Sequence, residues 1–210
     1  MKENLKVIIF DFDETMYYSS NIKQFYVEYI KKTLRSLTKH SDEKILELMK
    51  ENGFTSGGET RVSFGKNCLK FGVTPQQWNA YRIDNFFQID YDNAEVVNND
   101  ILKELSDVYK LYIVSNEIYE NIEFKAKKLG IDLSPFTLVA PKKCNVLDNK
   151  FSKQDAYQNI LDENDVSAKQ AMVFGDRYNV DILPLENLGG QGVLVKHPRE
   201  IEEYIKENLL

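Results

Sequence analysis

The chain has 210 residues and a formal net charge of −6 at neutral pH, with acidic and basic residues interleaved. This balance lacks the basic footprint of a nucleic-acid-binding protein, so we expect no nucleic-acid polymer as a partner. The two cysteines, Cys68 and Cys144, are too few for a disulfide framework or a zinc site. No stretch has the length of a membrane span or the layout of a signal peptide, so we expect a cytoplasmic protein without a membrane partner.

Short apolar runs with the composition of buried strands recur along the chain, at 6–10, 111–114, 137–140, 171–174 and 192–195. Helical patterns accompany the later runs, at 99–107, 117–129, 152–161 and 198–209. This alternation predicts an α/β fold, in which helices cover both faces of a mostly parallel sheet.

The segment 17–93 breaks this rhythm. It shows helical patterns at 22–37, 42–51, 59–71 and 75–87 but no convincing strand. We therefore predict an α-helical cap domain at 17–93, inserted into a catalytic core formed by 1–16 and 94–210. Opening and closing of such a cap would place hinges near 17–21 and 92–96.

Polar side chains follow three of the predicted strands. They are Asp11, Asp13 and Thr15 after the first, Ser115 and Asn116 after the second, and Asp176 and Asp181 after the fourth. A lysine, for which we favour Lys153, opens the helix before the fourth strand. Because open α/β sheets bind ligands at the carboxyl ends of their strands, we expect these groups to meet at one edge.

Together these groups suit the chemistry of a phosphate ester. Mg²⁺, which prefers oxygen ligands, can neutralise the charge that repels an anionic nucleophile, and Asp11 and Asp176 would supply carboxylates to it. One carboxylate can attack phosphorus, while a second carboxyl protonates the leaving oxygen and then deprotonates water. Ser115 and backbone N–H groups would hold the phosphoryl oxygens, and Lys153 would stabilise the developing charge.

In their order along the chain, these motifs resemble those of the haloacid dehalogenase superfamily. The family pattern is D-x-D-x-T/V, a Ser or Thr after the second strand, a Lys, and G-D-x-x-x-x-D, and all four motifs occur here. The resemblance covers nearly the whole chain and implies a Rossmann-like core with a helical C1 cap. It is closest to the branch of phosphoglycolate phosphatase, β-phosphoglucomutase and the nucleotidases.

The resemblance also implies roles for the first motif. Asp11 would be the nucleophile and a Mg²⁺ ligand. Asp13 would be the general acid and base, with its backbone carbonyl on Mg²⁺. Thr15 would support the loop that carries Asp13, in the phosphate-binding part of the site. Dehalogenases of the family lack an acid at the position of Asp13, so its presence favours phosphoester chemistry.

For the later motifs, the resemblance implies that Ser115 binds phosphate, with Asn116 beside it. Asp176 would be a Mg²⁺ ligand, and Asp181 a ligand directly or through water. Lys153 would be the catalytic lysine.

The chain departs from the family pattern at two positions. Gln154 follows Lys153 where the family usually has proline, and nearby lysines compete for the role, namely Lys142, Lys143 and Lys150. We favour Lys153 because it starts the helix at the spacing before Asp176 that the pattern requires. Glu14 stands where related enzymes often carry glycine or asparagine. Its carboxylate either alters substrate preference or points to solvent.

The sequence thus predicts a Mg²⁺-dependent phosphatase that acts on a small phosphorylated metabolite, such as a nucleotide, a sugar phosphate or phosphoglycolate. One alternative is a phosphomutase that uses the same aspartyl-phosphate. The other is a non-catalytic regulatory module that retains the fold. The sequence carries no signal for an oligomeric state.

Overall fold

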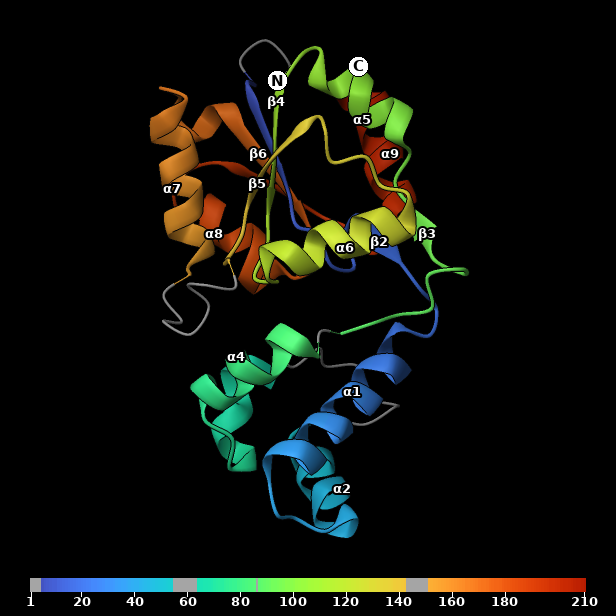
Figure 1. Ribbon diagram of the computed structural model, residues 1–210. Coiled ribbons are helices and arrows are strands. Elements are labelled where there is room, and N and C mark those ends of the chain that lie inside the picture. The colour runs from blue at the N-terminus through green and yellow to red at the C-terminus, as the bar shows by residue number, and fades with distance from the viewer. Residues whose placement is uncertain (1–4, 55–63, 86, 143–150) are drawn as a thin grey trace. The chain divides into compact units, whose positions relative to one another are not determined.

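The computed structural model describes residues 5–54, 64–85, 87–142 and 151–210 (Figure 1). The chain divides into two compact units. The described part of the first comprises 5–19, 91–142 and 151–210, and that of the second comprises 20–54, 64–85 and 87–90. Among the described residues, no helix combines the length and the apolar character needed to cross a membrane.

A parallel sheet of five strands, in the order β5-β4-β1-β6-β7, forms the centre of the first unit. The strands are β1 (Val7–Phe10), β4 (Lys110–Val114), β5 (Phe136–Val139), β6 (Ala171–Gly175) and β7 (Gln191–Leu194). The predicted α/β, Rossmann-like fold is confirmed. Because β1 is the middle strand, the residues that follow it lie at the centre of the carboxyl edge.

Helices cover both faces of this sheet (Figure 1). Side chains alternate along β1, so Val7 and Ile9 join the core cluster that includes the buried face of α7 (Lys153–Glu163). Phe10 points to the opposite face. It stacks on Phe174 at 5.2 Å between ring centroids, and Phe174 in turn contacts Tyr204 of α9 (Pro198–Asn208). The four residues of β1 are fully buried, as a central parallel strand requires.

The remaining described α-helices of this unit are α5 (Asn99–Ser106), α6 (Tyr119–Leu129) and α8 (Leu183–Glu186). In Figure 1, α7 and α8 lie on one side of the sheet, and α5 and α9 lie on the other. The sequence predicts helices at 99–107, 117–129, 152–161 and 198–209. All four form, with bounds within a few residues of the expected ones.

A short antiparallel ladder that the sequence does not predict joins β2 (Tyr17–Tyr18) to β3 (Glu95–Val96) in the first unit. Val97 extends it by donating its N–H to the carbonyl of Met16 at 3.0 Å. The ladder lies where the chain leaves and re-enters this unit. Strands of two residues are too short for alternation to reveal them in a sequence.

The second unit is helical, with α1 (Ile22–Leu37), α2 (Asp42–Glu51), α3 (Phe64–Asn67), the 3-10 turn η2 (Cys68–Phe71) and α4 (Pro75–Asp84). These helices match the expected patterns, except that 59–63 and Phe86 lie outside the described residues. An aromatic core that includes Phe54, Phe64 and Phe71 holds the unit together. Cys68 is a buried free thiol, and Cys144 lies outside the described residues.

Candidate active site

Asp11 follows the last residue of β1, at the centre of the carboxyl edge. Its backbone N–H donates to the carbonyl of Phe174 at 2.9 Å, which continues the ladder with β6 by one residue. Its side chain is buried, and its Oδ2 accepts a hydrogen bond from the hydroxyl of Thr15 at 3.3 Å. Thr15, which follows Asp11 in the same loop, therefore holds the Asp11 side chain directly.

Lys153 reaches the same point from the first residue of α7, where Ser152 caps the helix. Its buried ammonium donates to Asp11 Oδ1 at 2.6 Å and to Asp181 Oδ1 at 2.7 Å. The hydroxyl of Tyr157, one turn along α7, donates to the backbone carbonyl of Asp181 at 2.9 Å. The beginning of α7 is thus tied to both acidic loops.

Of the competing lysines, Lys142 lies over the ring of Tyr119, with its Nζ 5.4 Å from the ring centroid. Lys143 and Lys150 lie outside the described residues. Geometry therefore places Lys153 beside Asp11, as the spacing of the motif predicts.

Asp176 and Asp181 follow β6, the neighbour of β1. The chain turns there into a short π-helical segment, η5 (Tyr178–Ile182), and the backbone N–H of Arg177 donates to Asp181 Oδ2 at 2.9 Å. A Cβ at Gly175 would lie 2.4 Å from the Cβ of Asp181. A glycine before Asp176 is what allows Asp181 to fold back against the end of the strand.

Asp11, Asp176 and Asp181 form an acidic cluster in which one ligand atom from each lies within 4.8 Å of the others. Three carboxylates face the two cations Lys153 and Arg177, which leaves an excess of negative charge. Burial raises the pKa of Asp11 to about 7; Lys153 opposes this rise and the neighbouring carboxylates add to it. A set of oxygen donors with excess negative charge fits a hard divalent cation such as Mg²⁺.

Asp13 lies in a second cluster. Its Oδ1 accepts hydrogen bonds from the hydroxyl of Tyr17 and from Lys125 Nζ, the latter at 2.8 Å. Lys125 belongs to α6, is 1% exposed, and donates also to Glu117 Oε2 at 2.9 Å. Two carboxylates that are two residues apart in the chain therefore pair with different lysines from different helices.

The second cluster stabilises the charged forms of both Asp13 and Lys125. Burial alone would raise the pKa of Asp13, but Lys125 and the Tyr17 hydroxyl outweigh it and lower that pKa. Burial also disfavours the Lys125 ammonium, yet Asp13 and Glu117 raise the pKa of Lys125. Burial raises the pKa of Tyr17 well above its ordinary value, so its hydroxyl keeps the proton that it donates.

Ser115 follows β4 and is buried. Its backbone N–H donates a hydrogen bond to the carbonyl of Val139 at 3.2 Å. Its hydroxyl oxygen accepts the N–H of Glu117 at 3.1 Å, which links it to the Asp13 cluster. Asn116 beside it is exposed. The structure thus places Ser115 at the predicted edge, and its described side-chain hydrogen bond goes to the start of α6.

Glu14, which directly follows Asp13, has a φ of 61°. This left-handed conformation favours glycine or asparagine, the residues that the family resemblance leads us to expect at this position. The Glu14 side chain is half-buried rather than fully in solvent.

Sequence reasoning missed Lys125, Glu117 and Arg177. One signal was present for Lys125, because it shares the buried stripe of α6 with Ile122, Ala126 and Leu129. A lysine at an apolar position of a helix needs a buried partner. The partner itself, Asp13, is 112 residues away in the chain and is revealed only by the fold.

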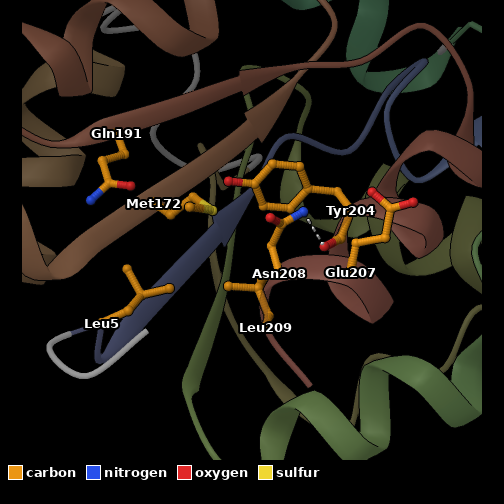
Figure 2. A pocket seen from close by; sticks show the side chains of 7 residues that line it. All are labelled: Leu5, Met172, Gln191, Tyr204, Glu207, Asn208 and Leu209. Carbon is orange, nitrogen blue, oxygen red and sulfur yellow. Dashed lines mark hydrogen bonds between the residues drawn. The ribbon is translucent and has the colours of Figure 1, made fainter. Parts of the chain in front are cut away.

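A cavity of about 180 Å³ lies at the opposite end of the sheet, beside the amino ends of β6 and β7 and the end of α9 (Figure 2). The side chains that line it are Leu5, Met172, Gln191, Tyr204, Glu207, Asn208 and Leu209. It contains none of the predicted site residues, which gather at the carboxyl ends of the strands.

A family model described as haloacid dehalogenase-like hydrolase matches residues 5–189. The chain belongs to this family of hydrolases. A search of curated proteins found no match to it.

Solved structures of this family share the fold. A haloacid dehalogenase-like hydrolase from Streptococcus pneumoniae is 19% identical, with a TM-score of 0.61 over 96% of this chain and 99% of that one. A protein from Haemophilus somnus described as a predicted phosphoglycolate phosphatase is 18% identical, with a TM-score of 0.57 over 92% and 86%. The HAD-hydrolase YfnB from Bacillus subtilis, described as bound to magnesium, is 13% identical, with a TM-score of 0.56 over 97% and 100%.

Replacing Lys153 by methionine should lower the free energy of unfolding by about 3 kcal/mol, because it leaves buried carboxylates without their cation. This loss is at the low end of the range for breaking a buried ion pair, because Asp11 can take up a proton and lose its unpaired charge. Urea denaturation at neutral pH measures it. Lys169→Met, at an exposed position of the same unit, is the control and should change stability by less than about 0.5 kcal/mol. Equal stability of Lys153→Met and wild type would show that these ion pairs do not hold the site.

Proposed function

We propose that the protein is a Mg²⁺-dependent phosphatase that hydrolyses a small phosphorylated metabolite through an aspartyl-phosphate. One observation carries the proposal: Asp11 and Asp13 follow the same strand but belong to two separate charge networks. Asp11 lies in an acidic cluster with Lys153, whereas Asp13 is fixed by Lys125 and Tyr17. Paired carboxylates in different environments are the usual basis for divided roles in catalysis.

In the first step, a carboxylate oxygen of Asp11 attacks phosphorus. An O–P bond forms to Asp11 as the bond from phosphorus to the leaving oxygen breaks. The leaving oxygen keeps the electron pair and takes a proton from the acid form of Asp13. The buried Lys153 ammonium, 2.6 Å from Asp11 Oδ1, stabilises negative charge at the reacting oxygens.

In the second step, water attacks phosphorus and gives a proton to Asp13, and the bond from phosphorus to Asp11 breaks to release phosphate. The lowered pKa of Asp13 makes the carboxylate its resting form, which is the form that this step requires. The first step uses the protonated form of Asp13, which the lowered pKa makes the minor form at neutral pH. Ser115, with Asn116 and backbone N–H groups, would bind the phosphoryl oxygens at the end of β4.

Asp11 and Asp176 would hold the Mg²⁺ ion, with the backbone carbonyl of Asp13 as a further ligand. When bound, the ion would neutralise charge between the carboxylates and the phosphoryl group. Both oxygens of Asp181 already accept hydrogen bonds, from Lys153 and from the Arg177 N–H. Asp181 would lie beside the ion and bind it directly or through water.

The helical second unit would serve as the cap that selects the substrate. Its chain enters after β2 and returns before β3, so both connections begin at the short antiparallel ladder. A nucleotide, a sugar phosphate and a phosphoglycolate-like compound are all compatible with this arrangement.

Phosphate release from 4-nitrophenyl phosphate tests the proposal. Wild type should release phosphate only with Mg²⁺, and Asp11→Asn should lower the rate by about 10³-fold or more because the nucleophile is lost. Asp155→Asn, an exposed aspartate in the first turn of α7, is the matched control and should retain the rate. No release by wild type, together with isomerisation of a sugar phosphate, would favour the phosphomutase instead.

Metal binding can be measured without turnover. Mg²⁺ at 100 times its dissociation constant should raise the free energy of unfolding of wild type by about 2.7 kcal/mol, because the ion binds the folded chain. Asp176→Asn should lose most of this increase when thermal unfolding is followed against Mg²⁺ concentration, whereas Asp155→Asn should keep it. An equal increase in Asp176→Asn and wild type would mean that Mg²⁺ binds elsewhere.

A further inference from the structure

Lys125 is a buried lysine that contacts the predicted proton-transfer residue rather than the nucleophile. It lies in the buried stripe of α6, and its ammonium bridges Asp13 Oδ1 at 2.8 Å and Glu117 Oε2 at 2.9 Å. An isolated ammonium at such a position would be strongly unfavourable, so these two carboxylates determine where it can lie.

Glu117 anchors Lys125 to a rigid part of the fold. Its own N–H donates to the Ser115 hydroxyl, and its Oε1 accepts the N–H of Ile118 at 2.7 Å and the side-chain amide of Asn121 at 3.3 Å. Glu117 is therefore fixed where β4 passes into α6. Lys125 is held from both sides, by Glu117 on its own helix and by Asp13 across from it.

The arrangement distinguishes the two oxygens of Asp13. Among the described residues, the hydrogen bonds to its side chain come from Tyr17 and Lys125, and both go to Oδ1. With Oδ1 occupied by two donors, Oδ2 is the oxygen that can exchange a proton with water or substrate. The side chain of Asp13 keeps 29% of its surface exposed, so solvent reaches it.

We propose that Lys125 and Glu117 are positioning residues for the second half of the reaction. They hold Asp13 as an oriented carboxylate whose Oδ2 takes the proton from the water that attacks the aspartyl-phosphate. The water oxygen bonds to phosphorus, its proton moves to Asp13 Oδ2, and the Asp11–phosphorus bond breaks with its electron pair returning to Asp11. This inference rests on the proposed phosphatase function.

The proposal predicts a specific kinetic signature for Lys125→Met. With 4-nitrophenyl phosphate, whose leaving group needs little protonation, formation of the phosphoenzyme should be nearly unchanged and its hydrolysis should slow. We expect kcat to fall by about 10- to 100-fold, within the range for proton-transfer catalysis, and KM to fall in proportion, so that kcat/KM stays within about threefold. A general loss of structure would instead lower kcat/KM.

The decisive measurement is the rate at which preformed, radiolabelled phosphoenzyme loses its phosphoryl group after a chase with unlabelled substrate. Lys125→Met should slow this rate by about 10- to 100-fold, and Lys125→Arg should restore much of it by keeping the charge. Glu117→Gln is a second variant that retains the Asp13–Lys125 pair, and it should slow the rate by a smaller factor. Lys127→Met, at an exposed position of the same helix, is the control and should match wild type.

Two kinds of failure are distinguishable. If wild type forms no phosphoenzyme, the proposed function is wrong and this inference falls with it. If wild type forms one and Lys125→Met hydrolyses it at the wild-type rate, the proposed function stands and the inference alone is overturned. If Lys125→Met does not fold, Glu117→Gln decides, and a wild-type rate of hydrolysis in that variant overturns the inference.

Discussion

The buried ammonium of Lys153 between Asp11 and Asp181 is the interaction on which the site depends. It brings together the end of β1, the loop after β6 and the first turn of α7, three segments that the chain order keeps far apart. The parallel order of the sheet places β1 beside β6, and Gly175 lets Asp181 fold against the strand end. Without Lys153, Arg177 alone would face the three carboxylates of the cluster, and Asp11 would lose its buried cation.

The same strand end serves two separate charge networks. Asp11 and Asp13 point to different networks although they are two residues apart, and Glu14 directly after them adopts the left-handed conformation. Asp11 then points to the cluster formed with β6 and α7, and Asp13 to the cluster formed with α6. A division of this kind would let one short loop carry the proposed nucleophile and the proposed proton-transfer group, each held by its own lysine.

Much of this could be predicted from sequence, because strand ends in a parallel sheet share one edge and the motif residues follow those ends directly. The strands, the helices and the proximity of Lys153 to Asp11 came from such local patterns. The Asp13–Lys125 pair could not be predicted, because only the packing of α6 brings together a residue of the first motif and a lysine 112 residues further along the chain. The β2–β3 ladder was missed because its strands of two residues carry no periodicity.

The central claim is that Asp11 becomes covalently phosphorylated. The most direct test is to mix the protein with Mg²⁺ and a phosphate ester, quench with acid within a turnover, and locate the phosphoryl group by mass spectrometry of the peptides. The account predicts the added mass on the peptide that contains Asp11, removable by hydroxylamine as expected for an acyl phosphate. A protein that releases phosphate while its Asp11 peptide stays unmodified at every quench time would contradict it.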